Sequence, residues 1–511
     1  MDLLSNLALG LSTAATVTNL TYCFIGVFLG TFIGVLPGVG PLAAVAMLLP
    51  VSFYLEPETA LVMLAGVYYG AEYGGSIASI LLNIPGTPSA SVTCIDGYPM
   101  AQQGRAGVAL FMTAMASFFG ALFGVVVMVL LSPKLAEFAL LFQPAEYFSV
   151  MVLGLIAASI VSASGALRGL MMVCLGILLG TVGVDVNSGE TRFTGGIQEL
   201  RDGVSLVVVA MGLFGVSEVM VSLRGATKSY AGEKVRMRNF LPTPSEWGRS
   251  IMPAIRGSAV GSFFGTLPGT GQTVASFVGY ALEKRINRRR AEFGKGAIEG
   301  VVVPETANNA AAQTAFIPTL TLGIPGSTTM ALMLGALMIH GITPGPRLIS
   351  DHPELFWGLV VSFLFGNLFL LVLNIPLIGI WVRLLRVPHH YLYPTVIVLI
   401  CVGVYGISNS ITDVWATLIF GVIGYVLRLF RFEPAPMLIG FILGPMMEEY
   451  FRRAMLLSRG DPMIFVERPG SAFLLGAGLL LLVLTVVPIK KIVQRLKGRL
   501  PMGERVARHH K

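Results

Sequence analysis

The chain has 511 residues, of which 54% are hydrophobic and only 12% are charged, and its mean hydropathy is +0.78. A typical soluble domain carries about 25% charged residues, so the composition excludes an ordinary water-soluble protein. Apolar runs of membrane-spanning length recur along the whole chain. We therefore expect an all-α polytopic membrane protein with about 10–12 transmembrane segments.

The net charge of +8 does not indicate nucleic-acid binding. Most basic residues fall in short loops between apolar runs, where they are typical of cytoplasmic anchoring to the lipid bilayer. The four cysteines stand singly, which favours packing over a disulfide or a metal site: Cys23, Cys94, Cys174 and Cys401. Residues 1–18 lack a basic start, so no cleavable signal is predicted.

A glycine–proline motif occurs twice, at Gly34–Pro41 and at Gly265–Gly271, 231 residues later. A second break follows each copy, at Asn83–Thr87 and at Gly323–Ser327, with an offset of 240 residues. Such recurrence indicates a duplicated unit whose helices are interrupted at matching places. Around the first motif these residues are identical in both copies: Gly30/Gly261, Phe32/Phe263, Gly34/Gly265, Leu36/Leu267, Pro37/Pro268, Gly38/Gly269 and Gly40/Gly271.

The two copies differ in the charge that surrounds them. No Lys or Arg precedes Arg105, whereas acidic Glu56 and Glu58 follow the first motif. Basic residues flank the second copy on both sides, over 224–249 and 284–295. Because basic loops stay in the cytoplasm, the first hairpin is predicted to enter from outside and the second from inside. The repeats are therefore predicted to have inverted topology.

Four regions follow from this interpretation: membrane repeat 1 over 1–223, a cytoplasmic basic linker over 224–249, membrane repeat 2 over 250–450, and over 451–511 an extra loop, a C-terminal transmembrane helix and a basic cytoplasmic tail. Repeat 1 is predicted to contain hairpin arms 16–36 and 42–55, a broken helix 59–94, a polar inner loop 96–107, spans 108–131, 147–161, 169–183 and 204–223, and an acidic outer loop 185–202. Repeat 2 is predicted to contain arms 251–267 and 272–282, a broken helix 297–340, a span 355–385 kinked near Pro376, and spans 391–405, 414–429 and 434–447. The last span is 471–487. The 451–470 loop is predicted to lie outside the cytoplasm although it carries arginines. Of all the loops, its predicted side agrees least with the rule that basic loops stay in the cytoplasm.

The predicted arm 272–282 has 11 residues and would rise only about 16 Å, roughly half of the hydrocarbon core. This length favours a re-entrant hairpin whose tip stops inside the membrane. Non-helical backbone cannot face lipid, so the tip is expected to be buried in protein or to line a wet cavity.

No catalytic signature is present. The six histidines form no His-x-x-x-His pattern, and no Cys-x-x-Cys or Gly-x-x-x-x-Gly-Lys-Ser/Thr sequence occurs. Gly-Val-Gly at 38–40 follows an apolar run instead of a strand, which is not a nucleotide-binding context. We therefore expect no enzyme activity and no cofactor, and a driving force supplied by an ion gradient or a partner.

The four breaks are the candidate substrate- and cation-binding site. Proline and glycine free backbone carbonyls, which suit a cation, and helix N-terminal amides, which suit a carboxylate. The alternative is that small residues there only let helices pack closely. The predicted site residues are Pro37, Gly38, Val39, Gly40, Glu72, Asn83, Pro85, Gly86, Thr87, Ser89, Pro268, Gly269, Thr270, Gly271, Gln272, Asn308, Asn309, Gly323, Pro325, Gly326, Ser327 and Thr328.

Two acidic residues fall in the predicted broken helices. Glu72 lies in the middle of its apolar span, where an ionisable side chain is costly and by default functional. The alternative is a hydrogen-bonded structural glutamate. Glu305 shares a polar face with Asn308 and Asn309 in the matching segment, and the alternative there is a position at the membrane interface.

Seven motifs together resemble the large membrane subunit of the tripartite tricarboxylate transporter family: Gly34–Pro41, Gly70–Ser76, Leu82–Ala90, Asp96–Pro99, Gly265–Gly271, Pro304–Asn309 and Gly323–Ser327. The resemblance covers essentially the whole chain. It implies secondary uptake of a carboxylate, either a tricarboxylate such as citrate or a related organic acid, coupled to Na+ or H+. It also implies a small membrane subunit and a periplasmic solute-binding protein as partners, in the bacterial inner (cytoplasmic) membrane.

Other classes remain open from the sequence. A gated anion channel or a permease for a non-carboxylate solute would share these features, and accumulation against a gradient separates a channel from a transporter. A membrane enzyme would need clustered catalytic side chains, and none are seen.

The inverted topology predicts opposite accessibility of the two hairpins. In a background without the native cysteines, Glu56→Cys should react with an impermeant maleimide in intact cells, whereas Lys284→Cys should react only after the membrane is opened. Labelling of both positions from outside would rule the inversion out.

Overall fold

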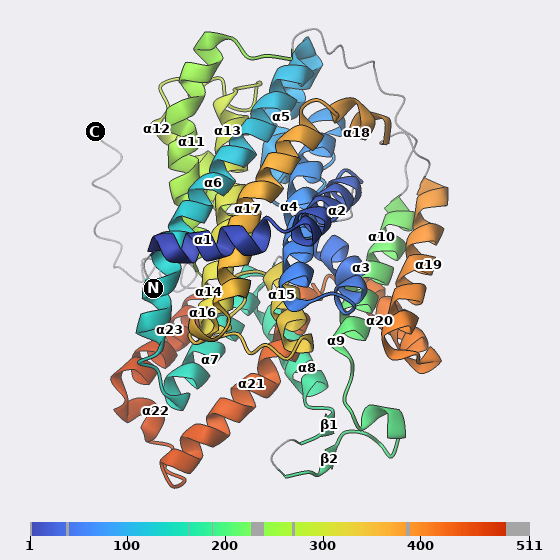
Figure 1. Ribbon diagram of the computed structural model, residues 1–511, viewed down its shortest axis with the longest axis vertical. Coiled ribbons are helices and arrows are strands. Elements are labelled where there is room, and N and C mark those ends of the chain that lie inside the picture. The colour runs from blue at the N-terminus through green and yellow to red at the C-terminus, as the bar shows by residue number, and fades with distance from the viewer. Residues whose placement is uncertain are drawn as a thin grey trace, which may run out of the picture.

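The computed structural model describes residues 3–36, 40–162, 164–185, 188–225, 240–267, 271–384 and 389–486. Within these ranges almost every element is a helix, and the only sheet is the antiparallel pair β1 (Gly183–Val184) and β2 (Thr191–Arg192). The all-α prediction is confirmed (Figure 1). The four cysteines are free; Cys23 is buried, Cys94 and Cys401 are half-buried, and Cys174 is exposed, so packing does not account for Cys174.

The helices of the first half are α1 (Leu3–Ala14), α2 (Val17–Gly34), α3 (Pro41–Ser52), α4 (Pro57–Leu82), α5 (Ser91–Met100), α6 (Ala106–Ala139), α7 (Pro144–Val161), α8 (Ala166–Gly180), α9 (Leu206–Ala210) and α10 (Ser217–Gly225). Those of the second half are α11 (Pro244–Gly265), α12 (Gly271–Ile286), α13 (Glu299–Thr314), α14 (Phe316–Leu322), α15 (Thr328–Ile339), α16 (Leu348–Asp351), α17 (Pro353–Asn374), α18 (Ile378–Leu384), α19 (His389–Ser408), α20 (Ile411–Leu429), α21 (Ala435–Leu457), α22 (Ile464–Glu467) and α23 (Pro469–Val486). Short irregular helices occur at Ala101–Arg105, Gln198–Leu200 and Met211–Val216.

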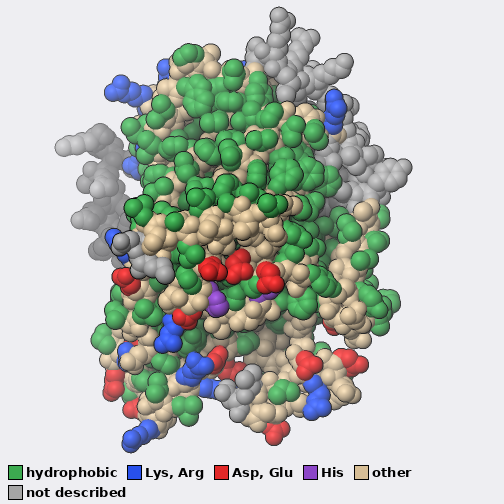
Figure 2. Space-filling view, viewed as in Figure 1, with side chains coloured by type: hydrophobic (Ala, Val, Ile, Leu, Met, Phe, Trp, Pro, Cys, Tyr) green, Lys and Arg blue, Asp and Glu red, His purple; other side chains and the backbone are tan. Residues whose placement is uncertain are grey.

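Among the described residues, four helical stretches are long and apolar enough to cross a membrane: Val17–Gly34, Ser91–Ala139, Pro353–Asn374 and Ile411–Leu429. Eight shorter apolar helices accompany them. Hydrophobic side chains cover most of the upper part of the face in Figure 2, and charged side chains gather below it. These features identify a multi-pass membrane protein, while the count of spans stays a prediction.

Glycine determines how each hairpin packs. The hairpin α2–α3 lies on α4, and the hairpin α11–α12 lies on α13. A Cβ atom added to Gly74 of α4 would lie 2.6 Å from the carbonyl oxygen of Thr31, and one added to Gly257 of α11 would lie 2.7 Å from that of Val303. Both helix pairs therefore make backbone contact through small residues, as membrane helices often do.

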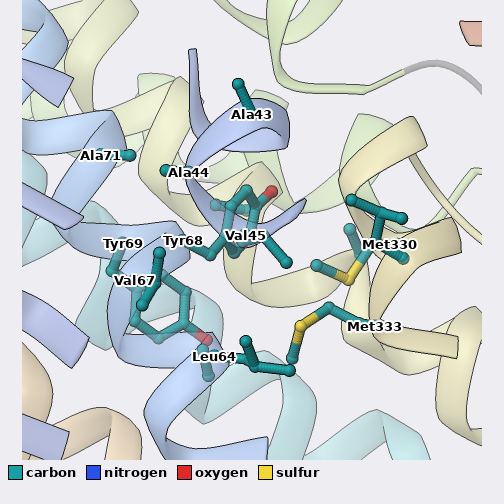
Figure 3. Close-up of a cluster of buried hydrophobic side chains, with 14 of the residues drawn as sticks. Ala43, Ala44, Val45, Leu64, Val67, Tyr68, Tyr69, Ala71, Met330 and Met333 are labelled. Atoms are coloured by element: carbon teal, nitrogen blue, oxygen red, sulfur yellow. The ribbon is translucent and has the colours of Figure 1, made fainter. Parts of the chain in front are cut away.

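The two halves interlock across the molecule. The broken helix α4 packs against α17 of the second half, and the matching helix α13 packs against α6 of the first half. Figure 3 shows the resulting core, where Ala43 and Val45 of α3, Tyr68 of α4, and Met330 and Met333 of α15 come together. Neither half therefore encloses its broken helix alone.

Segments that were predicted to share one side of the membrane do meet. At one end, the Gln103 amide donates to the Lys295 carbonyl over 2.8 Å. At the other end, Arg452 donates to Asp185 over 2.8 Å. Arg468 also pairs there with Glu146 over 2.6 Å. Arginines of the 451–470 region are thus ion-paired with acids of the same end, which offsets their charge. Which end faces the cytoplasm stays a prediction.

Three expectations about local structure were wrong, and one helix was not expected. Residues 96–107 are not a loop, because α5, a π-helical turn and α6 continue through them, with the kink absorbed by Gly104 at φ 77°. The second arm of hairpin two is α12 with 16 residues, about 24 Å long, because it extends past Leu282 to Ile286. Helix α21 continues to Leu457, where i,i+4 pairs such as Glu449–Arg453 support it. Helix α1, which crosses α17 in Figure 1, was not predicted.

The backbone contact between α2 and α4 predicts a steric effect. Gly74→Val places Cβ against backbone atoms that cannot rotate away, so it should destabilise the fold by about 1–3 kcal/mol or more. The measurement is the thermal unfolding temperature of the purified protein. Gly476→Val is the matched control, because no atom lies within 4 Å of its added Cβ. Equal unfolding temperatures for the two variants would contradict the close-packing account.

Candidate functional site

The second break of each repeat, which follows α4 in one half and α14 in the other, begins with the same backbone conformation in both halves. Helix α4 ends at Asn83 with φ 56° and ψ 28°, and α14 ends at Gly323 with φ 70° and ψ 23°. Glycine adopts this left-handed conformation readily, and asparagine is among the few other residues that tolerate it. A Pro-Gly pair follows two residues later in each half, and a new helix then begins, α5 or α15. The breaks are structurally equivalent.

A cavity of about 670 Å³ lies between the two breaks. It collects residues that are far apart in the sequence and come from both halves of the chain. The predicted site residues that line it are Gly40, Glu72, Pro85, Gly86, Thr87, Ser89, Gln272, Ser327 and Thr328.

Four helix N-termini converge on this cavity. Gly40 is the N-cap of α3, and Gln272 is the second residue of α12, so both hairpins contribute the start of their second arm. Ser89 lies just before α5, and Ser327 is the N-cap of α15, so both breaks contribute the helix that follows them. Each half thus supplies two N-termini, whose unpaired N–H groups and dipoles favour negative charge.

Hydroxyl groups at these N-termini are oriented by local hydrogen bonds. Ser327 Oγ accepts from the Met330 N–H over 3.3 Å, and Thr87 Oγ1 accepts from the Ala90 N–H over 3.2 Å. Thr87 Oγ1 also lies 2.8 Å from Ser89 Oγ. A hydroxyl that accepts such a bond still has its own hydrogen to donate. The Ser327 cap therefore holds a potential donor at the cavity wall, whereas Thr87 donates its hydrogen to Ser89, because Ser89 donates its own to Glu72.

Glu72 is the acidic residue of α4 that borders the cavity, and it is 2% exposed. Its Oε2 accepts from Asn308 Nδ2 over 3.0 Å and from Ser89 Oγ over 3.1 Å. Its Oε1 accepts from Gln272 Nε2 over 3.4 Å. Gln272 also contacts the Tyr68 hydroxyl. Glu72 thus joins elements of both halves.

Glu305 of α13 is equally buried but does not border the cavity. Its carboxylate accepts from Ser76 over 2.7 Å, from Thr93 over 2.6 Å and from Ser117 over 3.0 Å. It therefore lies inside the protein.

Not every predicted site residue reaches the cavity. Asn308 and Asn309 stand behind its wall, where Asn308 binds Glu72 and Asn309 Nδ2 donates to the Glu305 carbonyl over 3.0 Å. The break residues Asn83, Gly271, Gly323, Pro325 and Gly326 shape the turns but do not line the cavity. Pro37, Gly38, Val39, Pro268, Gly269 and Thr270 lie outside the described residues.

Charged residues outside the repeated sequence motifs also line the cavity, and they were not predicted from the sequence. Arg428 pairs with Glu218, and Glu433 accepts from Ser162 over 3.0 Å. Arg431 also lines the cavity, with φ 61°, and within the described residues its side chain has no ion-pair partner. Its backbone N–H bonds to the Arg428 carbonyl, and that of Phe432 bonds to the Leu427 carbonyl, which is a Schellman turn. Glycine is usual at that left-handed position, and only the structure shows that an arginine occupies it.

This arrangement is suited to binding and not to covalent chemistry. Helix N-termini, hydroxyls and arginines are groups that hold an anion. Among the described residues, no group of three or more His, Cys, Asp or Glu side chains could hold a metal ion.

A helical membrane protein whose cavity lies between two equivalent broken helices is, by class, a solute transporter. The chain belongs to the tripartite tricarboxylate transporter TctA family, whose family model matches residues 20–439. The resemblance inferred from the motifs is thereby confirmed, and the family is one of transporters and not of enzymes.

Two relatives come from Agrobacterium vitis. The uncharacterized 52.8 kDa protein in the TAR-I ttuC' 3' region is 48% identical over 488 residues, which cover 96% of this chain and 97% of the relative. The uncharacterized protein in the TAR-II ttuC' 3' region is 52% identical over 228 residues, which cover 45% of this chain and 94% of the relative. No solved structure matches the chain.

Arg431 gives a prediction about affinity for anions. Arg431→Gln removes an exposed positive charge at the cavity, so it should weaken carboxylate binding by about 1 kcal/mol, roughly fivefold. The measurement is the KM of carboxylate uptake in proteoliposomes. Arg459→Gln is a matched control, because Arg459 has φ 56° after α21 but does not line the cavity. An unchanged KM for Arg431→Gln would remove this residue from the site.

Proposed function

We propose that this chain is the large permease subunit of a binding-protein-dependent secondary transporter that imports a carboxylate. The observation that carries the proposal is the convergence of four helix N-termini, two from each half, on one cavity. Partial positive charge from four dipoles favours an anion, and hydroxyl donors at the same wall provide directed hydrogen bonds. A tricarboxylate such as citrate, or a related organic acid, has the matching charge.

The size of the cavity supports a small organic acid as substrate. Its volume of about 670 Å³ falls within the range of small-molecule sites, roughly 300–1,000 Å³. Arg428 and Arg431 also line the cavity, but so do Glu218, which pairs with Arg428, and Glu433, so these four side chains add no net charge. Glu72, in contrast, would repel an anion in the same cavity unless its own charge is balanced. Coupling to Na+ or H+ would supply that balance.

The remaining parts of the proposal concern partners and location. Family membership supports a small membrane subunit and a periplasmic solute-binding protein as partners, and the bacterial inner membrane as location. The break-lined cavity lies within the helical bundle, and a soluble partner would deliver substrate to it. No large extramembrane domain is seen among the described residues: β1 and β2 belong to a short excursion between α8 and α9.

Dependence on a binding protein is tested by reconstitution. Proteoliposomes with the two membrane subunits should take up little labelled citrate until the binding protein is added, and should then accumulate it against its gradient. Strong uptake by this chain alone would contradict binding-protein dependence. Equilibration without accumulation would favour the gated anion channel.

The position of the binding site is tested by four substitutions. Thr87→Ala and Ser327→Ala each remove a hydroxyl from a helix start, and loss of one charge-assisted hydrogen bond costs about 1.5–3 kcal/mol, roughly ten- to over a hundredfold in affinity. Gly38→Val and Gly269→Val are expected to impair transport as well. Membrane expression should persist in all four.

The controls for these substitutions are Val126→Ala and Leu479→Ala, whose side chains are exposed on the apolar surface. They should transport like the wild type. If the four site variants also transported at the wild-type rate with unchanged ion dependence, the breaks would be packing features and the site would lie elsewhere.

A further inference from the structure

Three buried acids in the described part of the chain, Glu72, Asp96 and Glu305, have no Lys, Arg or His partner. Asp96 accepts three backbone N–H bonds, whereas the two glutamates are bound by side chains alone. Glu283 is paired with Arg256 over 2.7 Å, and Glu299 with Arg249 over 2.8 Å. Glu72 and Glu305 have no Lys, Arg or His partner within the described residues, although both are buried at mid-helix in the core. A buried carboxylate without a positive partner is unfavourable, so some other species must balance the charge.

The hydrogen-bond donors around the two acids cross between the halves. Glu72 receives a bond from Asn308, which lies three residues after Glu305 on α13. Glu305 receives a bond from Ser76, which lies four residues after Glu72 on α4. Each acid is thus bound by a side chain from the helix that carries the other acid.

The kinds of donor nevertheless distinguish the acids. Glu305 is surrounded by three hydroxyls, which can also accept a bond, so its carboxyl group stays satisfied when it carries a proton. Glu72 receives N–H bonds from the NH2 groups of Asn308 and Gln272, which cannot accept, and one bond from the Ser89 hydroxyl, which can. Those amides favour the ionised form of Glu72, whose charge then needs a cation.

An unpartnered oxygen lies beside Glu72. Asn308 is 2% exposed, and its Oδ1 has no hydrogen-bond partner, whereas Nδ2 of the same amide donates to Glu72. A buried carbonyl oxygen without a donor costs about 1–3 kcal/mol. A bound cation would remove this cost and the charge of Glu72 together.

We propose that the Glu72 carboxylate, Asn308 Oδ1 and Ser89 Oγ are ligands of one Na+ ion. All three are oxygen ligands, and the single carboxylate balances one monovalent charge, whereas a divalent ion would call for more acidic ligands. Because Glu72 and Ser89 also line the cavity, the bound ion neutralises the wall that an anion approaches. Na+ therefore binds before the carboxylate substrate. This order of binding rests on the proposed transport function.

Binding of ²²Na+ to the purified full-length protein tests the site directly. Ionic strength is held constant with choline chloride. The wild type should bind ²²Na+ saturably, and Glu72→Gln and Asn308→Leu should each lower the affinity at least tenfold.

Asn374→Leu is the matched control for Asn308→Leu. Asn374 is also a buried asparagine with an unpartnered Oδ1, but it lies on α17 and does not line the cavity. It should bind Na+ like the wild type. Unfolding temperatures identify any variant that fails to fold, and Glu72→Asp, which keeps the charge, should retain measurable binding. Absence of saturable wild-type binding, or equal affinity in all variants, would overturn the site.

Uptake of labelled citrate with the binding protein separates the two proposals. Stimulation by Na+ that is lost in Glu72→Gln supports both of them. Uptake driven by a pH gradient and indifferent to Na+ overturns the Na+ site and leaves carboxylate transport standing. Intact ²²Na+ binding without citrate uptake in any gradient supports the site and counts against the proposed substrate class.

Discussion

Interrupted helices inside an apolar bundle impose the constraint on which this structure depends. Each break leaves backbone N–H and C=O groups without helical partners, and lipid offers none. The second break is buried in protein over 323–326, whereas Asn83, Ile84 and Pro85 of the first break are exposed. Residues of both breaks line one cavity. The interrupted backbone therefore lies at the candidate binding site.

Electrostatics inside the bundle follow from that geometry. Four helix starts give the cavity partial positive character, whereas Glu72 contributes a negative charge at the same wall. A site with both signs would hold an anion more readily together with a cation, as the proposed coupling requires. The amides and hydroxyls around Glu72 and Glu305 fix where each charge can reside. Close glycine contacts such as Gly74 with Thr31 hold the helices that carry them.

Much of the candidate site could be predicted because it depends on local chemistry. Proline and glycine at duplicated positions signal breaks in any fold, and Glu72 is conspicuous within an apolar run. Helix boundaries were less predictable. Polar residues at 96–107 resembled a loop, but Gly104 absorbs the kink and the helices continue. Arg431 was not among the predicted site residues, because its place beside the cavity depends on how α20 and α21 pack.

The sequence by itself determined the membrane class, the helical fold and the family, since composition, hydropathy and motif spacing are properties of the linear chain. It also located the two breaks. Only the tertiary structure decided which polar groups meet. Glu72 lies 200 residues before Gln272 and 236 residues before Asn308, and helix packing brings the three side chains together. The unpartnered Asn308 oxygen has no linear signature either: a missing hydrogen bond exists only once every neighbour has its place in space.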